Sequence, residues 1–128
     1  MNIFKDHIDA KRVLREVYIL SRLKHKNIIQ IEDVYCDFRN SNGNLQYSVY
    51  LFSPLGVCDL QDLLKMKEPI DEYTVKYISS QILEALLYLK HMGILHRDIK
   101  PGNILIMKDL NVKLIDFGLS REVNSKTD

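Results

Sequence analysis

The sequence predicts an α+β fold with two well-defined helices and two antiparallel hairpins. Two segments repeat apolar residues at three- and four-residue steps, which is typical of amphipathic helices. A third segment, rich in β-branched and aromatic residues, surrounds an Asn-Gly tip, which indicates a β-hairpin. Two short apolar runs near the C-terminal end indicate a second hairpin. The chain is therefore expected to pack helices against antiparallel strands.

The composition is that of one globular domain without a strong charge. Of the 128 residues, 46% are hydrophobic, which is enough for a core. The net charge of +1, from 18 basic and 17 acidic residues, provides no basic surface for nucleic acid or for an anionic membrane. No apolar run is long enough for a signal peptide or a membrane span, and Cys36 and Cys58 match no metal spacing and are predicted to be reduced thiols. We expect a cytoplasmic or nuclear monomer with no nucleic-acid or membrane partner.

The first half of the chain predicts a helix followed by a hairpin. Residues 8–24 carry an apolar stripe with charges on the other face. The stripe consists of Val13, Leu14, Val17, Leu20 and Leu23. After a break, residues 28–36 are predicted as a strand, and residues 46–52 as its partner. The loop between them has Asn42, Gly43 and Asn44 at its tip, which favour positive backbone torsions.

The second half begins with a short helix and continues into a long one. Pro54 ends the preceding strand, and Asp59 is a suitable N-cap for the short helix. Pro69 and Asp71 introduce a helix over residues 72–91, and Gly93 ends it. Its apolar face is predicted to contain Val75, Ile78, Ile82, Leu86 and Leu89. Its tyrosines, Tyr73, Tyr77 and Tyr88, are predicted to pack and not to stack on bases.

Polar residues at fixed spacing follow this helix. Residues 96–103 read H-R-D-I-K-P-G-N, and D-F-G follows at residues 116–118. The runs 104–107 and 112–115 form the second predicted hairpin, which would bring Asn103 and Asp116 close together. An acid, an amine and hard oxygen ligands suit phosphoryl transfer, which requires a positioned nucleophile and neutralised phosphate charge. Magnesium prefers such oxygens.

These residues resemble the catalytic loop and the D-F-G motif of eukaryotic protein kinases, and the roles below are carried over from that family. The resemblance implies ATP and Mg²⁺ as cofactors and a protein hydroxyl as the acceptor. Asp98 and Lys100 correspond to the catalytic acid and lysine, and Asn103 and Asp116 to the metal ligands. The lysine two residues after the acid is typical of serine/threonine kinases.

Four neighbouring residues have supporting roles in the family. His96 corresponds to a histidine that packs and holds the loop and is not a base. Arg97 corresponds to the arginine that contacts a phosphate or an acid on the activation segment. Phe117 and Gly118 complete D-F-G.

The resemblance extends to the nucleotide pocket. Glu16, in K-R-V-L-R-E-V-Y-I-L, matches the C-helix glutamate that pairs with a strand lysine, although the pattern alone would make it a solvated helix residue. Residues 53–59 match the hinge and the start of the D helix, although a plain turn and helix cap would fit them equally well. Six further residues belong to the pocket that the resemblance implies. Four lie in residues 53–59: Ser53 behind the nucleotide, Pro54 and Gly56 offering backbone groups to adenine, and Asp59 near the ribose. The other two are Leu105 beneath the adenine and Ile115 on its inner wall.

The implied fold is the central portion of a protein-kinase-like domain: C helix, hairpin, hinge, D and E helices, catalytic loop and D-F-G hairpin. Residues 1–53 would belong to the small lobe, 54–58 to the hinge and 59–128 to the large lobe. The motifs resemble the mitogen-activated protein kinase group (CMGC), and Nemo-like kinases in particular. The sequence has neither a Gly-rich loop, since its first glycine is Gly43, nor the strand lysine.

We therefore expect Met1 to be an internal methionine or the sequence to be a truncated gene model, and the 128 residues alone to be inactive. A protein substrate and an upstream kinase are the expected partners of the full-length protein. The alternative function is a non-catalytic kinase fragment or pseudokinase that acts as an interaction module. A helical nucleic-acid module is disfavoured by the neutral charge.

Overall fold

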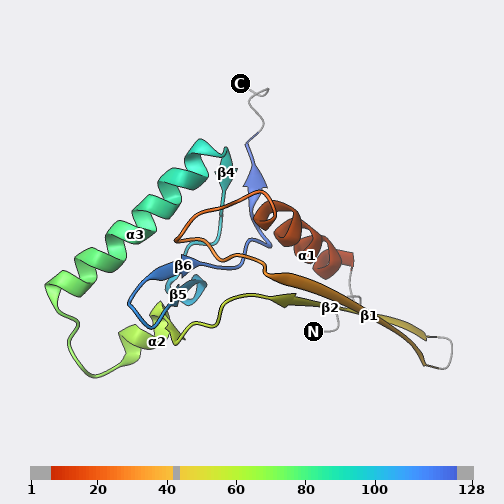
Figure 1. Cartoon of the computed structure of the whole chain (residues 1–128), viewed down its shortest axis with the longest axis horizontal. Coiled ribbons are helices and arrows are strands. Elements are labelled where there is room, and N and C mark those ends of the chain that lie inside the picture. Colours follow the sequence, from red (N-terminus) through yellow and green to blue (C-terminus); the bar gives the residue numbers. More distant parts are fainter. Residues whose placement is uncertain (1–6, 42–43, 124–128) are drawn as a thin grey trace.

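The computed structural model describes residues 7–41 and 44–123 and has the predicted mixture of helices and antiparallel strands (Figure 1). Its elements are α1 (His7–Leu20), β1 (Asp33–Ser41), β2 (Asn44–Phe52), β3 (Cys58–Asp59), α2 (Leu60–Lys65), α3 (Glu72–His91), β4 (Ile94–Leu95), a 3-10 turn (Pro101–Asn103), β5 (Ile104–Ile106), β6 (Val112–Leu114) and β7 (Arg121–Glu122). The short strands β3, β4 and β7 were not predicted. Both predicted hairpins are present.

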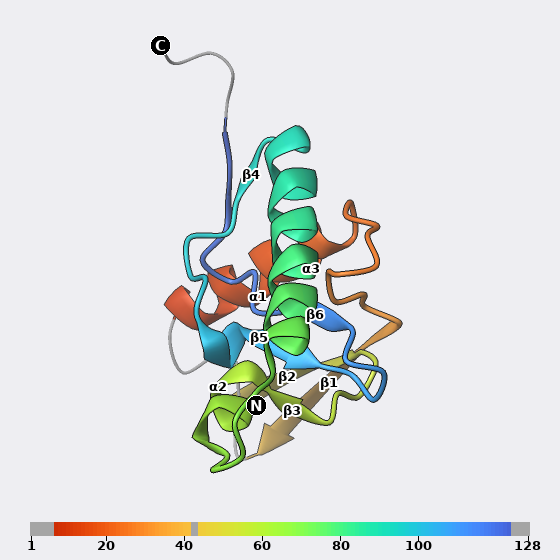
Figure 2. The same cartoon turned by 90° about the vertical axis from the view of Figure 1, so that its left-hand side faces the viewer.

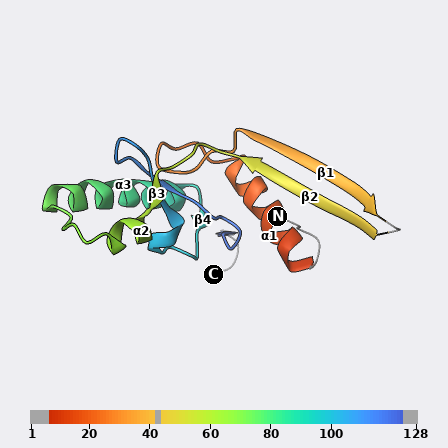
Figure 3. The ribbon, with the colours of Figure 1, turned by 90° about the horizontal axis from the view of Figure 1, so that it is seen from below.

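The strands form three small antiparallel sheets: β1–β2, β3–β5–β6 and β4–β7. The hairpin β1–β2 extends away from the rest of the molecule (Figures 1 and 3). The predicted tip residues Asn42 and Gly43 lie outside the described residues. Several large apolar side chains on this hairpin are exposed, including those of Tyr35, Phe38 and Phe52.

The prediction of a strand over residues 28–36 is partly wrong. Strand β1 begins only at Asp33, and Ile28 instead forms an isolated parallel bridge with Leu114 of β6. The N–H of Ile29 donates to the carbonyl of Leu114, and the N–H of Leu114 donates to the carbonyl of Asn27. Apolar β-branched residues suit any pleated surface, so local sequence could not show which strand they join.

Helix α1 ends at Leu20, four residues before the predicted end. The N–H groups of Arg22 and Leu23 bond to carbonyls only three residues back, so the chain tightens and turns Leu23 into the core. Within the predicted stripe, Leu14 is 68% exposed, whereas Ile19, which the stripe omitted, is buried.

Helix α3 has the predicted bounds. The carboxylate of Asp71 caps its first turn by accepting from the N–H of Thr74, and Gly93 follows its end with a φ of 65°. The buried residues are Ile78, Gln81, Ala85 and Leu89, while the predicted Val75 is exposed. The polar Gln81 and the small Ala85 thus lie on the buried face of α3, where hydrophobicity alone would not place them.

The core lies between α3, the β5–β6 hairpin and the C-terminal end of α1, elements that Figure 2 labels. It includes Phe117. Among the helices that the structure describes, none combines the length and apolarity needed to cross a bilayer. Cys36 and Cys58 are free thiols, as predicted.

Candidate functional site

A cleft of about 720 Å³ lies between α1, the end of β2 and the segment that leads into D-F-G. Eight of the predicted site residues line it: Glu16, Ser53, Asp98, Lys100, Leu105, Ile115, Asp116 and Gly118. They come from four separate parts of the chain. Pro54, Gly56, Asp59, His96, Arg97, Asn103 and Phe117 are not among the lining residues.

Asp98 is held by two neighbouring side chains. Its Oδ2 accepts hydrogen bonds from Lys100 Nζ and from Asn103 Nδ2, each at 2.8 Å. Asn103 Nδ2 also donates to the backbone carbonyl of Asp98 at 2.9 Å. The hydrogen bond from Lys100 lowers the pKa of Asp98, and the same bond raises the pKa of Lys100. The acid is therefore ionised and the amine protonated at neutral pH.

The D-F-G segment lies directly beside the catalytic loop. The N–H of Ile115 donates to the carbonyl of Asn103 at 3.0 Å, so the two predicted metal ligands belong to adjoining backbone positions. Asp116 adopts a left-handed φ of 62°, and its Oδ1 accepts from the N–H of Gly118 at 3.3 Å. The carboxylate reaches the cleft while Phe117 is fully buried.

His96 is a buried residue beneath the loop. Its Nε2 lies 3.0 Å from the carbonyl of Ile115, its Nδ1 accepts from the N–H of Asp98, and its ring packs edge-on against Phe117. These two bonds define a neutral ring protonated at Nε2. Burial lowers the pKa of His96, which favours the same neutral form. The geometry agrees with a supporting role.

Arg97 lines a different depression from the cleft. It has a left-handed φ of 68°, and its Nε donates to the carbonyl of Leu119 at 2.6 Å. Together with Lys11, Arg15 and Arg121, it lines a separate basic depression beside α1. The phosphate or acid contact expected for Arg97 stays a prediction.

Glu16 is turned toward D-F-G and is not a solvated surface residue. Its Oε1 accepts from the N–H of Phe117 at 3.4 Å, and burial raises the pKa of its carboxyl. Within the part of the chain that the structure describes, no ion pair joins Glu16 to a lysine or an arginine. The glutamate that the resemblance pairs with a strand lysine thus lies at D-F-G without a cationic partner among the described residues.

The hinge residues have structural tasks that the sequence only partly indicated. A Cβ on Gly56 would lie 2.3 Å from Leu105 Cγ, so only glycine lets the hinge pack onto the cleft floor. Asp59 caps α2, because its Oδ1 accepts from the N–H of Asp62 at 2.7 Å. Ser53 lines the cleft.

The donor set suits magnesium shared with a phosphate ligand better than a protein cage. In the described ranges, no group of three or more His, Cys, Asp or Glu side chains could hold a metal ion. Magnesium, however, commonly takes one or two carboxylates and completes its shell with phosphate and water oxygens. Asp116 would supply the carboxylate, and the amide oxygen of Asn103 would be a second hard ligand.

Two arginines of α1 were missed at this site. Arg12 lines the cleft one helical turn before Glu16, and Arg15 Nη1 donates to the carbonyl of Gly118 at 2.9 Å. The four-residue spacing of Arg12 and Glu16 was a signal that they share a helix face. No local signal pointed to the Arg15 contact, which joins residues 103 positions apart.

Comparisons with known proteins show the family to which this sequence is similar. The protein kinase domain family model matches residues 2–128. Similar proteins include mitogen-activated protein kinase 4 of Oryza sativa subsp. japonica, 38% identical over 125 residues, and mitogen-activated protein kinase 7 of Arabidopsis thaliana, 38% identical over 120 residues. These alignments cover 98% and 94% of this chain but only 33% and 32% of the relatives, so the chain spans about a third of their length.

Proposed function

This chain belongs to the protein kinase family, and from that premise we propose that it carries the phosphoryl-transfer site of a serine/threonine kinase of the mitogen-activated group. The observation that carries the proposal is that Lys100 and Asn103 both donate hydrogen bonds to Asp98, which lines the same cleft as Asp116. Membership of the Nemo-like subfamily rests on motif resemblance alone and gains no support from the plant relatives. A protein substrate, an upstream kinase and a cytoplasmic or nuclear location belong to the same proposal.

Each residue has a chemical task in this proposal. Lys100 and Asn103 occupy Oδ2 of Asp98, which leaves Oδ1 to accept a hydrogen bond from the attacking hydroxyl. Because its pKa is lowered, Asp98 orients the hydroxyl more than it acts as a strong base. Lys100 places positive charge near the transferred group. Magnesium, when bound by Asp116 and Asn103, would neutralise phosphate charge.

A nucleotide thermal-shift experiment tests this proposal. Because a ligand that binds only the folded state raises stability, by about 2.7 kcal/mol at a hundredfold excess over Kd, Mg²⁺-ADP should raise the Tm of the chain. Asp116→Ala should abolish the magnesium-dependent part of the shift. An unchanged Tm in saturating Mg²⁺-ADP would contradict the proposal.

The second candidate function is a non-catalytic interaction module, and one observation favours it. Glu16 has no cationic partner among the described residues, and a kinase uses that pair to position ATP phosphates. This candidate predicts no magnesium-dependent nucleotide shift. It also predicts no phosphoryl transfer by the 128 residues, so transfer that disappears in Asp116→Ala would exclude it.

A further inference from the structure

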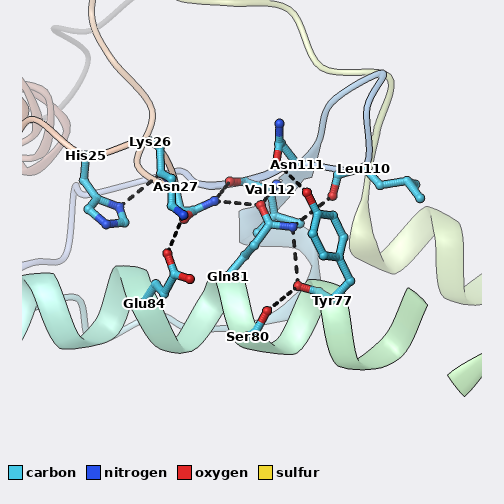
Figure 4. Close-up of polar contacts among 10 residues, drawn as sticks. All are labelled: His25, Lys26, Asn27, Tyr77, Ser80, Gln81, Glu84, Leu110, Asn111 and Val112. Carbon is cyan, nitrogen blue, oxygen red and sulfur yellow. Dashed lines mark hydrogen bonds and ion pairs between the residues drawn. The ribbon is translucent and has the colours of Figure 1, made fainter. Parts of the chain in front are cut away.

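Two buried amide side chains connect three segments of the molecule (Figure 4). Asn27 and Gln81 are only 1% and 4% exposed. Asn27 Nδ2 donates to Gln81 Oε1 at 2.8 Å and to the carbonyl of Val112 at 2.9 Å, while Gln81 Oε1 also accepts from the N–H of Val112 at 3.0 Å. Gln81 Nε2 donates to the carbonyl of Leu110 at 3.2 Å. The pair thus joins the segment after α1 to α3 and to β6.

Further contacts bind the same segment, residues 24–29, to α3. The N–H of Lys24 donates to the hydroxyl of Tyr88, whose ring stacks on His25. His25 Nδ1 accepts from the N–H of Asn27, and Lys26 forms an exposed ion pair with Glu84 (Figure 4). The end of α1 is therefore attached to the helix behind the site.

Residue 27 also sets the position of the strand that leads into D-F-G. Its carbonyl accepts from the N–H of Leu114 at 2.9 Å, and Leu114 lies two residues before Asp116. At the other end of the circuit, Arg15 and Glu16 of α1 bond to Gly118 and Phe117. The contacts form a closed ring: α1, residues 24–29, β6, D-F-G and α1 again.

The chemistry of this pair favours a role in positioning. The side-chain NH₂ group of Asn27 can donate to two acceptors. A carboxylate at residue 27 has no hydrogen to donate, and it would place an oxygen against the two oxygens that accept these bonds. Asn27 Oδ1 is buried without a hydrogen-bond partner among the described residues, which costs stability. An amide here is thus a poor choice for stability alone, but it specifies which backbone groups meet.

We propose that Asn27 and Gln81 are positioning residues, an amide clamp that holds Asp116 beside Asn103 and keeps α1 in register with D-F-G. Its significance rests on the proposed function, because Asp116 and Asn103 are the proposed metal ligands. The hydrogen bonds of the clamp join protein groups only. Their formation can therefore be tested on the nucleotide-free chain, separately from the proposed function.

Amide hydrogen exchange by NMR on the nucleotide-free chain is the test. The reporter of the clamp is the N–H of Ile115, which bonds to the carbonyl of Asn103, and the reporters of global stability are the N–H groups of Ala85 and Leu89 in α3. Asn27→Asp should accelerate exchange at Ile115 by tenfold or more and at Ala85 and Leu89 by less than twofold. Equal acceleration of both sets, as from general destabilisation, would overturn the proposal, as would an unchanged rate at Ile115.

Lys26→Ala is the matched control, since it removes the neighbouring ion pair and spares the clamp; both sets should stay within twofold of the wild-type rates. If Asn27→Asp does not fold, Gln81→Met removes the clamp from the α3 side and should give the same selective pattern.

The wild-type chain offers a test without any variant. Its Asn27 side-chain amide protons should exchange at least a hundredfold more slowly than those of free asparagine, and free exchange would refute the clamp. Absent nucleotide binding would refute the proposed function and leave these rates unaffected.

Discussion

Three non-glycine residues among the described ones have a left-handed backbone: Arg97 in the catalytic loop, Asp116 in D-F-G, and Leu110 in the turn between β5 and β6. Arg97 and Asp116 have φ values of 68° and 62°, a conformation that costs non-glycine residues on the order of 1–3 kcal/mol. At Arg97, the turn separates a buried His96 from an Asp98 that reaches the cleft. At Asp116, it separates the cleft-lining carboxylate from the buried Phe117. At these two positions, the left-handed backbone thus lies where adjacent side chains must point in different directions.

The lowered pKa of His96 predicts a specific pH dependence of stability. As the pH falls below about 6.5, the unfolded chain takes up a proton that the folded His96 resists, so the free energy of unfolding should decrease until the pH passes below the folded pKa. Urea unfolding between pH 7.5 and 5.5 measures this. The pKa of His25 is also lowered. The difference in the free energy of unfolding between wild type and His96→Gln therefore separates the contribution of His96 from that of His25. A difference that is flat, or that grows on acidification, would contradict the assignment.

Gly56→Ala should destabilise the protein by about 1–3 kcal/mol, because the new methyl group would overlap Leu105 and push it into the cleft. The free energy of unfolding measures the cost. In a Leu105→Ala background, the same substitution should cost less than about 0.5 kcal/mol, since its obstacle is gone. An equal cost in both backgrounds would show that the contact with Leu105 is not the cause.

Residue spacing predicted the set Asp98, Lys100, Asn103 and Asp116, because a short motif keeps its members close whatever the rest of the chain does. It did not predict the buried amides Asn27 and Gln81. Their burial depends on partners up to 85 positions away along the chain, and isolated polar residues normally indicate a surface.

At the scale of elements, α3 was predicted to the residue because its N-cap Asp71, the glycine that follows its end, Gly93, and its periodicity are all local signals. The start of β1 was missed for the opposite reason. Residues 28 and 29 pair with Leu114 in the core, and this pairing depends on a contact between distant parts of the chain that the local sequence does not indicate. The strands β3, β4 and β7, of two residues each, are too short for any period to be visible.

Asp59 provides a prediction for α2. Asp59→Ala should lower the free energy of unfolding by about 1 kcal/mol, whereas Asp59→Asn, which keeps a capping oxygen, should change it by no more than a few tenths. Chemical denaturation of both variants measures the difference. Equal costs would contradict the capping role. A loss of nucleotide affinity in the Asn variant, with the cap intact, would instead support the ribose contact implied by the resemblance.

For the whole molecule, the cleft depends on bringing distant segments together. Residues 12–20, 29–31, 51–53, 98–105 and 115–119 all contribute lining, and the core between α3 and the β5–β6 hairpin holds the catalytic loop against them. Family resemblance predicted this assembly, whereas periodicity predicted only its parts. The catalytic loop, D-F-G and Glu16 converge on one cleft, which supports a phosphoryl-transfer site.

Paramagnetic mapping with Mn²⁺ in place of Mg²⁺ tests this central claim most directly, because both ions favour carboxylate and carbonyl oxygens. In the presence of ADP, substoichiometric Mn²⁺ should selectively broaden the amide resonances of Asp98, Asn103 and Asp116, and Asp116→Asn should remove the effect. Broadening confined to other acidic residues, or unchanged by that substitution, would contradict a metal–nucleotide site in this cleft.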